Sequence, residues 1–159
     1  MAEFHIHIAG DDLAFSAAHF ITFGENVCEP LHGHNYRVGA EVWGPLDENQ
    51  YVVDFVALHK ALRTVLDALD HAVLLPTGHR SIRVAAGSSE VEVTFQQRRW
   101  VFPREDCRLL PLANTTAELL ARHIGQRLLE ELGASGTAAV QRLRIEVEES
   151  PGHSAFCEL

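Results

Sequence analysis

Two histidines separated by a single glycine, in the stretch CEPLHGHNYRV (residues 28–38), have a spacing that suits metal binding. Side chains alternate faces along a β-strand, so His32 and His34 would point the same way, roughly 6–7 Å apart. A third candidate, His19, ends the upstream segment FSAAH. Three neutral imidazoles and one open position are typical of a catalytic zinc site. Core histidines held by hydrogen bonds are the alternative, and spacing alone leaves both interpretations open.

Cys28 lies shortly before these histidines and could act on whatever the metal holds. Free cysteines are often only small buried hydrophobic residues, which is the competing interpretation. We expect Cys28 in a loop, where a nearby metal and imidazoles would lower the pKa of its thiol and favour the reactive thiolate. Its neighbour Glu29 is the first alternative if Cys28 is not the base.

A second pair with the same spacing, His5 and His7 in FHIHI (residues 4–8), alternates with apolar residues. This pattern favours a half-buried strand whose histidines face solvent, so we do not expect a site there. A cupin-like metal site would need a carboxylate a few residues after His34. The first acidic residue is Glu41, which lies too far along the following strand segment, so a cupin is disfavoured.

Asp70 and His71 come together at the predicted end of a helix. A cationic histidine at a helix C-terminus is favourable because of the helix dipole, which would be a purely structural explanation. Alternatively, the carboxylate holds the imidazole in one tautomer, as proton-transfer sites require. The sequence favours neither interpretation over the other.

Glu149 extends the inward side of the last long predicted strand, in VQRLRIEVEES (residues 140–150). Leu143, Ile145 and Val147 occupy that side before it. A carboxylate on an apolar face costs on the order of several kcal/mol unless it is paired. The partner of Glu149 could be an arginine. It could also be a buried ligand with two N–H groups, one hydrogen-bonded to each carboxylate oxygen.

These residues must be positioned by helices and strands, and the predicted order of those elements indicates an α+β domain. It would have an antiparallel sheet with two helices on one face. Apolar residues at helical spacing predict both helices, the first N-capped by Asp54. A capping box of Thr115 and Glu118 would begin the second helix, and Gly133 would end it. The expected elements, in order, are strands at 4–8, 13–19 and 35–43, a helix at 55–69, a hairpin at 81–95, a strand at 98–102, a helix at 114–133, and strands at 140–150 and 154–159.

The composition is that of one soluble domain, residues 1–159, with 47% hydrophobic and 22% charged residues. A net charge of −9 argues against nucleic acid or an anionic membrane surface as the main partner. We expect no signal peptide, and no segment approaches the roughly 18 apolar residues of a membrane-spanning helix. The three cysteines are scattered and form no disulfide framework, which favours a reducing cytoplasm.

Six segments of the chain carry a family resemblance, and they are, in chain order, FSAAH, CEPLHGHNY, VVDF, LDH, TTAE and EESP. In type and order they resemble segments of the 6-pyruvoyl- and 6-carboxy-tetrahydropterin synthase family. They are spread over nearly the whole chain, and C-x-x-x-H-G-H after A-A-H is the most specific of them. The resemblance implies the tunnelling fold, in which an antiparallel four-stranded sheet carries two helices on one face, here with a hairpin inserted between the helices. It also implies a hexamer made of two trimers, with active sites at subunit interfaces.

The resemblance further implies roles for individual residues. Cys28 would be the general base, and Asp70 with His71 would form a second proton-transfer pair. Glu149 would bind the 2-amino and N3 edge of a pterin. The zinc ligands would all be histidines, namely His19, His32 and His34. The pterin pocket would also contain Thr116, Ala117 and Glu118.

By this resemblance the chain is a cytoplasmic, zinc-dependent lyase of the queuosine-pathway type. The expected reaction converts 7,8-dihydroneopterin triphosphate to 6-carboxy-5,6,7,8-tetrahydropterin and releases acetaldehyde and triphosphate. Alternatives within the enzyme class are formation of 6-pyruvoyl-tetrahydropterin and side-chain cleavage to a 6-hydroxymethyl pterin. An alternative of another class is a non-catalytic pterin- or purine-binding protein, which would have no need of Cys28, Asp70 and His71.

Overall fold

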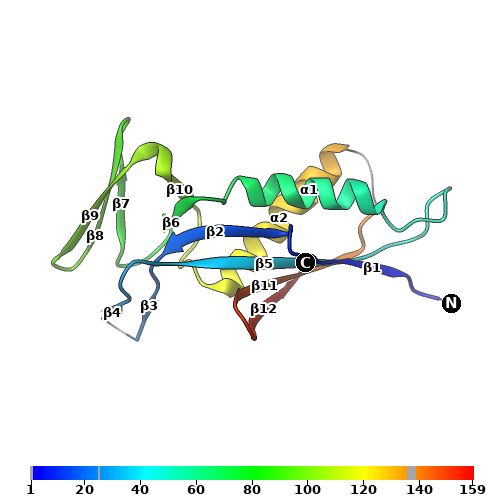
Figure 1. Ribbon diagram of the computed structural model, residues 1–159, viewed down its shortest axis with the longest axis horizontal. Helices are drawn as coiled ribbons and strands as arrows, with labels where there is room; N and C mark the ends of the chain where they lie inside the picture. The colour runs from blue at the N-terminus through cyan, green and yellow to red at the C-terminus, as the bar shows by residue number, and fades with distance from the viewer. Residues whose placement is uncertain (1, 25, 136–138) are drawn as a thin grey trace.

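A curved seven-stranded sheet forms the main body of the protein, and two helices cover one of its faces (Figure 1). The computed structural model describes residues 2–24, 26–135 and 139–159. The helices are α1 (Phe55–Asp67) and α2 (Ala117–Ser135). The strands of the main sheet are β1 (His5–Ile8), β2 (Ala14–His19), β5 (His32–Trp43), β6 (Ala72–Pro76), β10 (Cys107–Leu110), β11 (Arg142–Ser150) and β12 (His153–Glu158).

The strand order in the main sheet is β10–β6–β2–β5–β11–β12, with β1 also paired to β5. The strands β2, β5, β11 and β12 pair antiparallel and form the expected four-stranded unit. The sheet is larger and mixed, however, because β6 pairs parallel with both β2 and β10. The α+β tunnelling-fold class is confirmed, and only the number and direction of the strands differ from expectation. Periodicity could not identify β6, because its short apolar run does not alternate.

The strands β1 and β2 follow one another along the same edge of β5. The residues of β5 from 40 to 43 pair with β1, and those from 32 to 37 pair with β2. The prediction that the first strand resumes after the GDD turn is therefore confirmed. This register brings the end of FSAAH directly beside the HGH segment, since His19 is the ladder partner of His32.

The main core fills the space between the sheet and the helices. Phe15 of β2 and Tyr36 of β5 stack there, with ring centroids 4.7 Å apart. Burying one aliphatic side chain contributes roughly 1.5–3 kcal/mol, so the apolar stripes of the helices hold them against the sheet. The stripe residues that are buried include Leu58, Leu62, Leu66, Leu120, Ile124 and Leu128.

Helix α1 begins at the predicted N-cap. The carboxylate of Asp54 accepts a hydrogen bond from the backbone N–H of Ala57 at 2.8 Å. The helix ends at Asp67, and a short turn then leads to the Asp70–His71 pair. Within the described part of the chain, neither helix combines the length and apolar character that crossing a membrane requires.

Helix α2 begins one residue later than its predicted capping box requires. The hydroxyl of Thr116, not that of Thr115, accepts from the backbone N–H of Leu119 at 3.4 Å. Leu119 therefore occupies the position that a capping-box Glu118 would need, and that prediction is wrong. The predicted stop at Gly133 is also wrong, because the helix continues to Ser135. A glycine inside a helix costs only about 1 kcal/mol, which the packed stripe offsets.

A separate three-stranded sheet projects from one end of the molecule and confirms the predicted hairpin and following strand (Figure 1). Its apolar face packs on the end of the main sheet and forms a second core cluster around Phe20, Val91, Val93 and Phe95. The elements at this end are β7 (Arg83–Ala86), β8 (Glu90–Phe95), β9 (Arg98–Pro103), a 3₁₀ turn (Arg104–Asp106) and the small ribbon of β3 (Thr22–Phe23) and β4 (Val27–Cys28).

Candidate metal centre

Three histidines from two neighbouring strands form the centre of the candidate site. His19 ends β2, and His32 and His34 lie on β5, with one ligand nitrogen of each within 4.8 Å of the others. Both histidines of β5 face the helix-covered side of the sheet, because they alternate with exposed Gly33 and Asn35. The sequence prediction that these three side chains come together is confirmed.

Hydrogen bonds orient two of the three rings. Nδ1 of His19 lies 2.8 Å from the carbonyl oxygen of Thr115, and Nδ1 of His32 lies 2.8 Å from that of Pro30. A carbonyl can only accept, so each Nδ1 carries the proton and each Nε2 presents its lone pair. Histidines that bind metals are typically held in this way by a second shell of acceptors.

The third ring, His34, has no such partner. Its Nε2 is buried and has no hydrogen bond among the described residues. Burial also lowers the pKa of His19, mainly through desolvation, and so favours the neutral form that a metal requires. A core histidine satisfied by hydrogen bonds, the alternative interpretation, would not leave Nε2 of His34 without a hydrogen bond. The group could therefore bind a metal ion through three imidazoles.

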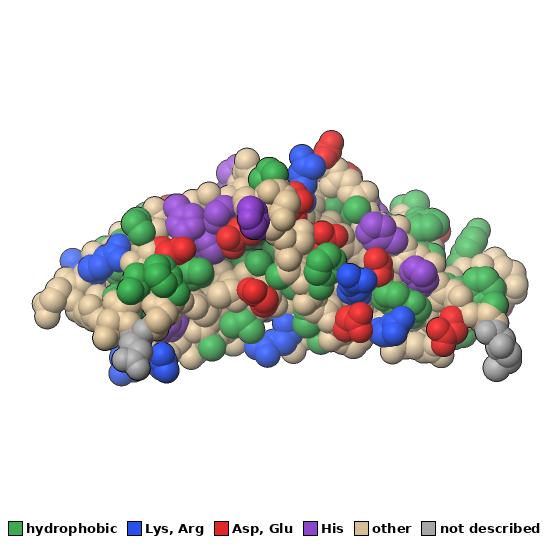
Figure 2. All heavy atoms as spheres, turned by 90° about the horizontal axis from the view of Figure 1, so that it is seen from below, with side chains coloured by type: hydrophobic (Ala, Val, Ile, Leu, Met, Phe, Trp, Pro, Cys, Tyr) green, Lys and Arg blue, Asp and Glu red, His purple; other side chains and the backbone are tan. Residues whose placement is uncertain are grey.

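Two carboxylates flank the histidines. The oxygens of Glu149 lie 3.6 Å from Nε2 of His34 and 4.0 Å from Nε2 of His19, and an oxygen of Glu29 lies 3.7 Å from Nε2 of His32. Histidine and acidic side chains gather together on the face of the molecule that Figure 2 shows. In the described chain, the side chains that pair with Glu149 are thus histidines, where an arginine was the structural alternative.

A local irregularity of β11 helps to place Glu149. The ladder between β11 and β12 changes register between Glu148 and Ser150, so Glu149 is the extra residue of a bulge. A bulge re-aims a side chain and breaks the regular pairing of its strand. The carboxylate is half-buried at the end of the apolar row, with 29% of the side chain exposed, as the inward alternation predicted.

A pocket of about 510 Å³ has Glu149 in its wall, and this carboxylate links the pocket to the histidine group. This volume is in the range of small-molecule sites. The first turn of α2 forms another wall, so the structure places the predicted pocket residues together. The residues that line it are Ile21, Thr116, Ala117, Glu118, Glu149, Gly152, His153, Ser154 and Ala155.

Cys28 lies at the end of β4, half-buried against the second core cluster. Burial raises the pKa of its thiol; the Arg98 guanidinium lowers that pKa and the Glu29 carboxylate raises it further. The sequence predicts a lowered thiol pKa, whereas burial, the largest effect at Cys28, raises it. The reason is that apolar contacts of the inserted sheet remove the thiol from water.

Asp70 and His71 form the predicted carboxylate–imidazole pair, with 3.0 Å between Oδ2 and Nδ1. The backbone N–H of Ser16 donates to Asp70 at 2.8 Å, and this bond, followed by the contact with His71, lowers the pKa of the carboxyl group. His71 has a positive φ of 53° and a side chain that is 82% exposed. Because the backbone and Asp70 hold it, the exposed ring has a defined position.

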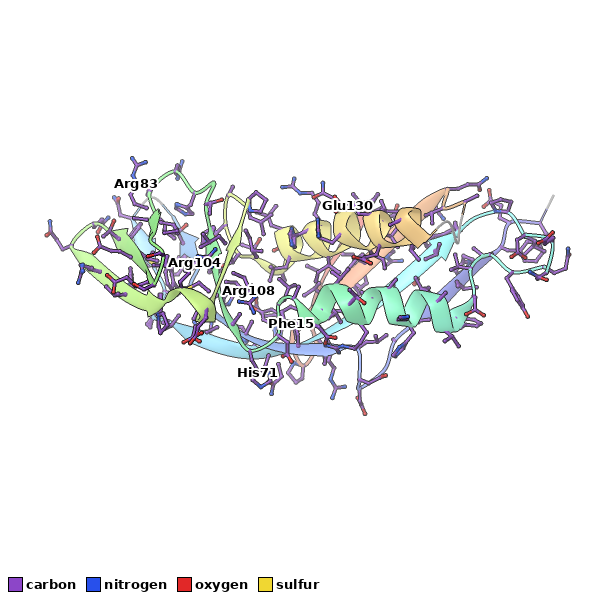
Figure 3. All side chains as sticks on the ribbon, turned by 90° about the horizontal axis from the view of Figure 1, so that it is seen from above. Phe15, His71, Arg83, Arg104, Arg108 and Glu130 are labelled. Atoms are coloured by element: carbon purple, nitrogen blue, oxygen red, sulfur yellow. The ribbon has the colours of Figure 1, made fainter. Side chains whose placement is uncertain are left out.

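This pair lies on the opposite face of the sheet from the three histidines. His71 lines a second pocket, of about 540 Å³, together with Gly33, His34 and Asn35 of β5. Gly33 and Asn35 are exposed on this face, since they alternate with the metal-site histidines. Figure 3 shows His71 on the outer side of the sheet, whereas Phe15 lies toward the helices. Within the described chain, His71 is therefore not a member of the three-histidine group, although its pocket reaches His34 from the other face of the sheet.

The sequence analysis missed two contacts of the site. The carbonyl of Thr115 orients His19, and Arg98 donates to the carbonyl of Cys28 at 2.8 Å. Neither contact has a signal in the local sequence, since each joins distant segments. The prediction for the other H-x-H pair is confirmed: His5 and His7 are exposed, and His5 stacks on Trp43.

Comparisons with known proteins agree with one another. A protein-family model described as 6-pyruvoyl tetrahydropterin synthase matches residues 11–159. The putative 6-carboxy-5,6,7,8-tetrahydropterin synthase of Methanocaldococcus jannaschii is 30% identical over 144 residues, covering 90% of this chain and 88% of that protein. The 6-carboxy-5,6,7,8-tetrahydropterin synthase of Haemophilus influenzae is 29% identical over 160 residues, covering 92% and 94%.

Solved structures give the same result at the level of the fold. The crystal structure of 6-pyruvoyl tetrahydropterin synthase from Plasmodium vivax superposes with a TM-score of 0.91 at 28% identity, covering 100% of this chain and 99% of that one. A variant of the same Plasmodium vivax enzyme, in which a glutamate described as a catalytic residue is replaced by alanine, also has a TM-score of 0.91.

Proposed function

The chain belongs to the 6-pyruvoyl tetrahydropterin synthase family, and we propose that it converts 7,8-dihydroneopterin triphosphate and water to 6-carboxy-5,6,7,8-tetrahydropterin, acetaldehyde and triphosphate. The names of the Methanocaldococcus jannaschii and Haemophilus influenzae relatives support this product. The observation that carries the proposal is the position of Glu149, which contacts the histidine group and also lines the adjoining pocket. A pterin bound by Glu149 would lie beside the metal donors.

We propose zinc as the metal, held by His19, His32 and His34. An all-imidazole donor set with no thiolate is typical of catalytic rather than structural zinc. When bound, the ion would supply Lewis-acid polarisation of the substrate's side-chain hydroxyl groups. The buried, unpaired Nε2 of His34 and the oriented rings of the other two histidines support this assignment.

The remaining residues would bind substrate and move protons. Glu149 would accept hydrogen bonds from the 2-amino and N3 groups of the pterin, since a carboxylate matches two parallel N–H donors. Cys28 would take a proton from the substrate side chain as its thiolate. His71, held by Asp70, would be the second proton carrier, because its exposed ring is free to reach a bound molecule.

The opposite-face position of His71 supports a site shared between subunits. We propose a hexamer of two trimers in which His71 of one subunit serves the metal centre of a neighbour. The exposed edges of the sheet also favour association, because unpaired strand edges bind other strands. A cytoplasmic enzyme acting on a free pterin, without nucleic acid or membrane, agrees with the acidic net charge of −9.

The direct test is to incubate the purified, zinc-loaded protein with 7,8-dihydroneopterin triphosphate and identify the products by mass. We expect 6-carboxy-tetrahydropterin together with acetaldehyde in equal amount. A pyruvoyl product without acetaldehyde would reassign the reaction within the family. Pterin binding with no product would support the non-catalytic alternative, in which the pocket is kept without the chemistry.

Replacement of Glu149 by glutamine is expected to weaken pterin binding. The change keeps the shape of the side chain but sets an N–H group against the N–H groups of the pterin. Leaving such buried donors unpaired costs roughly 1–3 kcal/mol, so affinity should fall about 5- to 150-fold. Calorimetric titration of the variant and of the wild-type protein with a pterin product measures the change in Kd.

Glu148→Gln is the matched control, because Glu148 is the neighbouring residue and pairs with Arg37 in the β5 ladder. We expect its pterin affinity to match that of the wild-type protein. Zinc content should be measured in both variants. A Glu149→Gln protein that lost zinc would identify Glu149 as a metal ligand, and one that bound pterin normally would make its carboxylate structural.

The shared site predicts that two inactive variants restore activity when they are mixed. Cys28→Ala and His71→Ala subunits would each lack one proton carrier. A mixed hexamer would contain sites with Cys28 from one subunit and an intact His71 from its neighbour. Random exchange at equal amounts should restore roughly a quarter of the wild-type activity.

The mixing experiment requires denaturation and joint refolding, with each variant refolded alone as the control. Light scattering should report a hexamer for all samples. If the activity of the mixture only equals the sum of the activities of the two variants refolded alone, both proton carriers of a site belong to the same subunit. A monomer at micromolar concentration would contradict the proposed assembly.

Side-chain cleavage to a 6-hydroxymethyl pterin is a second candidate, and Glu29 favours it. Its carboxylate lies 3.7 Å from Nε2 of His32, which places a second base beside the metal donors. The Plasmodium vivax enzyme is described with a catalytic glutamate. Product analysis of Glu29→Gln separates the two reactions: loss of a hydroxymethyl product with the carboxy product retained would assign cleavage to Glu29.

A further inference from the structure

We propose that Arg98, on the inserted three-stranded sheet, is a positioning residue that holds the backbone of Cys28 and Glu29 in place for the reaction. The inference rests on the proposed function of Cys28. It concerns a part of the chain, the hairpin β8–β9, to which the proposed reaction assigns no role. Figure 1 shows this sheet and the β3–β4 ribbon at the same end of the molecule.

Contacts between the hairpin and the ribbon carry the inference. The guanidinium of Arg98 donates to the carbonyl oxygen of Cys28 at 2.8 Å and lies 3.5 Å from that of Glu29. A second bond joins the same segments, from the side-chain amide of Gln96 to Asn26 at 3.2 Å. The hairpin therefore holds the ribbon through side chains on both sides of Cys28.

Arg98 is itself held in position. Its guanidinium lies over the ring of Trp100, 4.6 Å from the centroid. Trp100 in turn stacks on Phe20, with ring centroids 4.6 Å apart and an angle of 15° between the planes. Phe20 is buried and directly follows the metal-site residue His19. A cation–π contact on a ring that is packed this way restricts the arginine, so its hydrogen bonds cost less side-chain entropy.

The segment around Cys28 needs such a support because its own hydrogen bonds are few. Strand β4 has only two residues, and its pairing with β3 covers only positions 27 and 28. Glu29 is tied to Ile21 by a backbone bond of 2.9 Å and by its carboxylate at 3.4 Å. Small displacements of a catalytic group lower rates strongly, so a fixed backbone at these two residues would be functionally important.

The charge of Arg98 also acts on the thiol. The charged groups that influence Cys28 are Arg98 and Glu29; the guanidinium lowers the pKa of the thiol and the carboxylate raises it, against the larger effect of burial. Removing the guanidinium should therefore make the thiolate less available at a given pH. The pH dependence of thiol reactivity therefore tests the role of Arg98. It would stay unchanged in an Arg98 variant if the residue had only a structural role.

Arg98→Gln is the test variant, and Arg99→Gln is its matched control. Arg99 is the next residue on β9 and points to the other face, where it pairs with Glu92 at 2.6–2.7 Å. The two variants lose the same charge from the same strand. Arg98→Lys keeps the charge and one set of donors, and it serves as the rescue variant.

The first measurement is the rate at which iodoacetamide alkylates Cys28 in the zinc-loaded protein, followed from about pH 6 to pH 10 by mass spectrometry of the Cys28 peptide. We expect Arg98→Gln to move the profile to higher pH and to slow alkylation near neutrality by roughly two- to fivefold. Arg99→Gln should match the wild-type protein, and Arg98→Lys should lie between. This assay uses no pterin, so its result is independent of the proposed reaction.

The second measurement is turnover with 7,8-dihydroneopterin triphosphate. We expect kcat of Arg98→Gln to fall roughly three- to tenfold with KM and zinc content nearly unchanged. An unchanged alkylation profile would overturn the proposal, as would an equal loss of turnover in Arg98→Gln and Arg99→Gln. A raised KM with unchanged kcat would place Arg98 at the substrate instead of the Cys28 segment, which also overturns it.

Discussion

Replacing Cys28 by alanine is expected to lower turnover by about 10²–10⁴-fold, the usual effect of losing a general base. The change removes the proposed base but leaves the three histidines and Glu149 intact. Because the thiol is half-buried and small, alanine leaves little empty space, and the protein should stay folded. Pterin affinity and zinc content should both remain near the wild-type values, so that only the chemical step is affected.

The pH dependence of turnover provides a second check on Cys28. Burial raises the pKa of its thiol above the ordinary value of 9.0, and the thiolate is the basic form. Turnover of the wild-type enzyme should therefore increase with pH through neutrality and into the alkaline range. Cys28→Ala should lose this increase, whereas Cys157→Ala, which changes another half-buried thiol, should keep it. Normal turnover of Cys28→Ala would move the base to Glu29.

Replacing His32 by alanine is expected to remove most of the metal and nearly all of the activity. The wild-type protein should carry about one zinc ion per chain, and the variant less than roughly a tenth of that, since two imidazoles hold zinc far more weakly than three. His32 is the best ligand to change, because its side chain is 37% exposed whereas His19 is buried. Zinc content by atomic emission and turnover on the same sample measure both effects.

His7→Ala is the matched control for the metal site, because it removes a histidine with the same H-x-H spacing from an exposed position. Its zinc content and activity should equal those of the wild-type protein. Both variants should keep the same hexamer by light scattering. If His32→Ala retained a full complement of zinc, the three histidines would not be the ligand set.

The sequence by itself determined which side chains share a face. His32 and His34 point together because strand residues alternate, and the same rule places Leu143, Ile145 and Val147 in one buried row. The N-cap at Asp54 was also correct, since a capping side chain bonds within its own turn. These properties depend on residues only a few positions apart, and a local pattern contains all the information that they need.

Boundaries that depend on competing local signals were less certain. The capping box of Thr115 and Glu118 places the start of α2 one residue too early. In the folded protein the hydroxyl of Thr116 caps the helix, and the carbonyl of Thr115 contacts His19. No local rule contains the contact between Thr115 and His19, which lie 96 residues apart.

Only the tertiary structure decided how the segments meet. His19 joins the HGH pair because the β2–β5 register places it opposite His32, and its orienting carbonyl lies 96 residues further along the chain. Arg98 reaches Cys28 across 70 residues, through a packed hairpin that has no motif of its own. The face on which His71 lies follows from the parallel pairing of β6 with β2. Strand order, register and direction are set by contacts between distant residues, and short-range periodicity is the same whichever partners a strand finds.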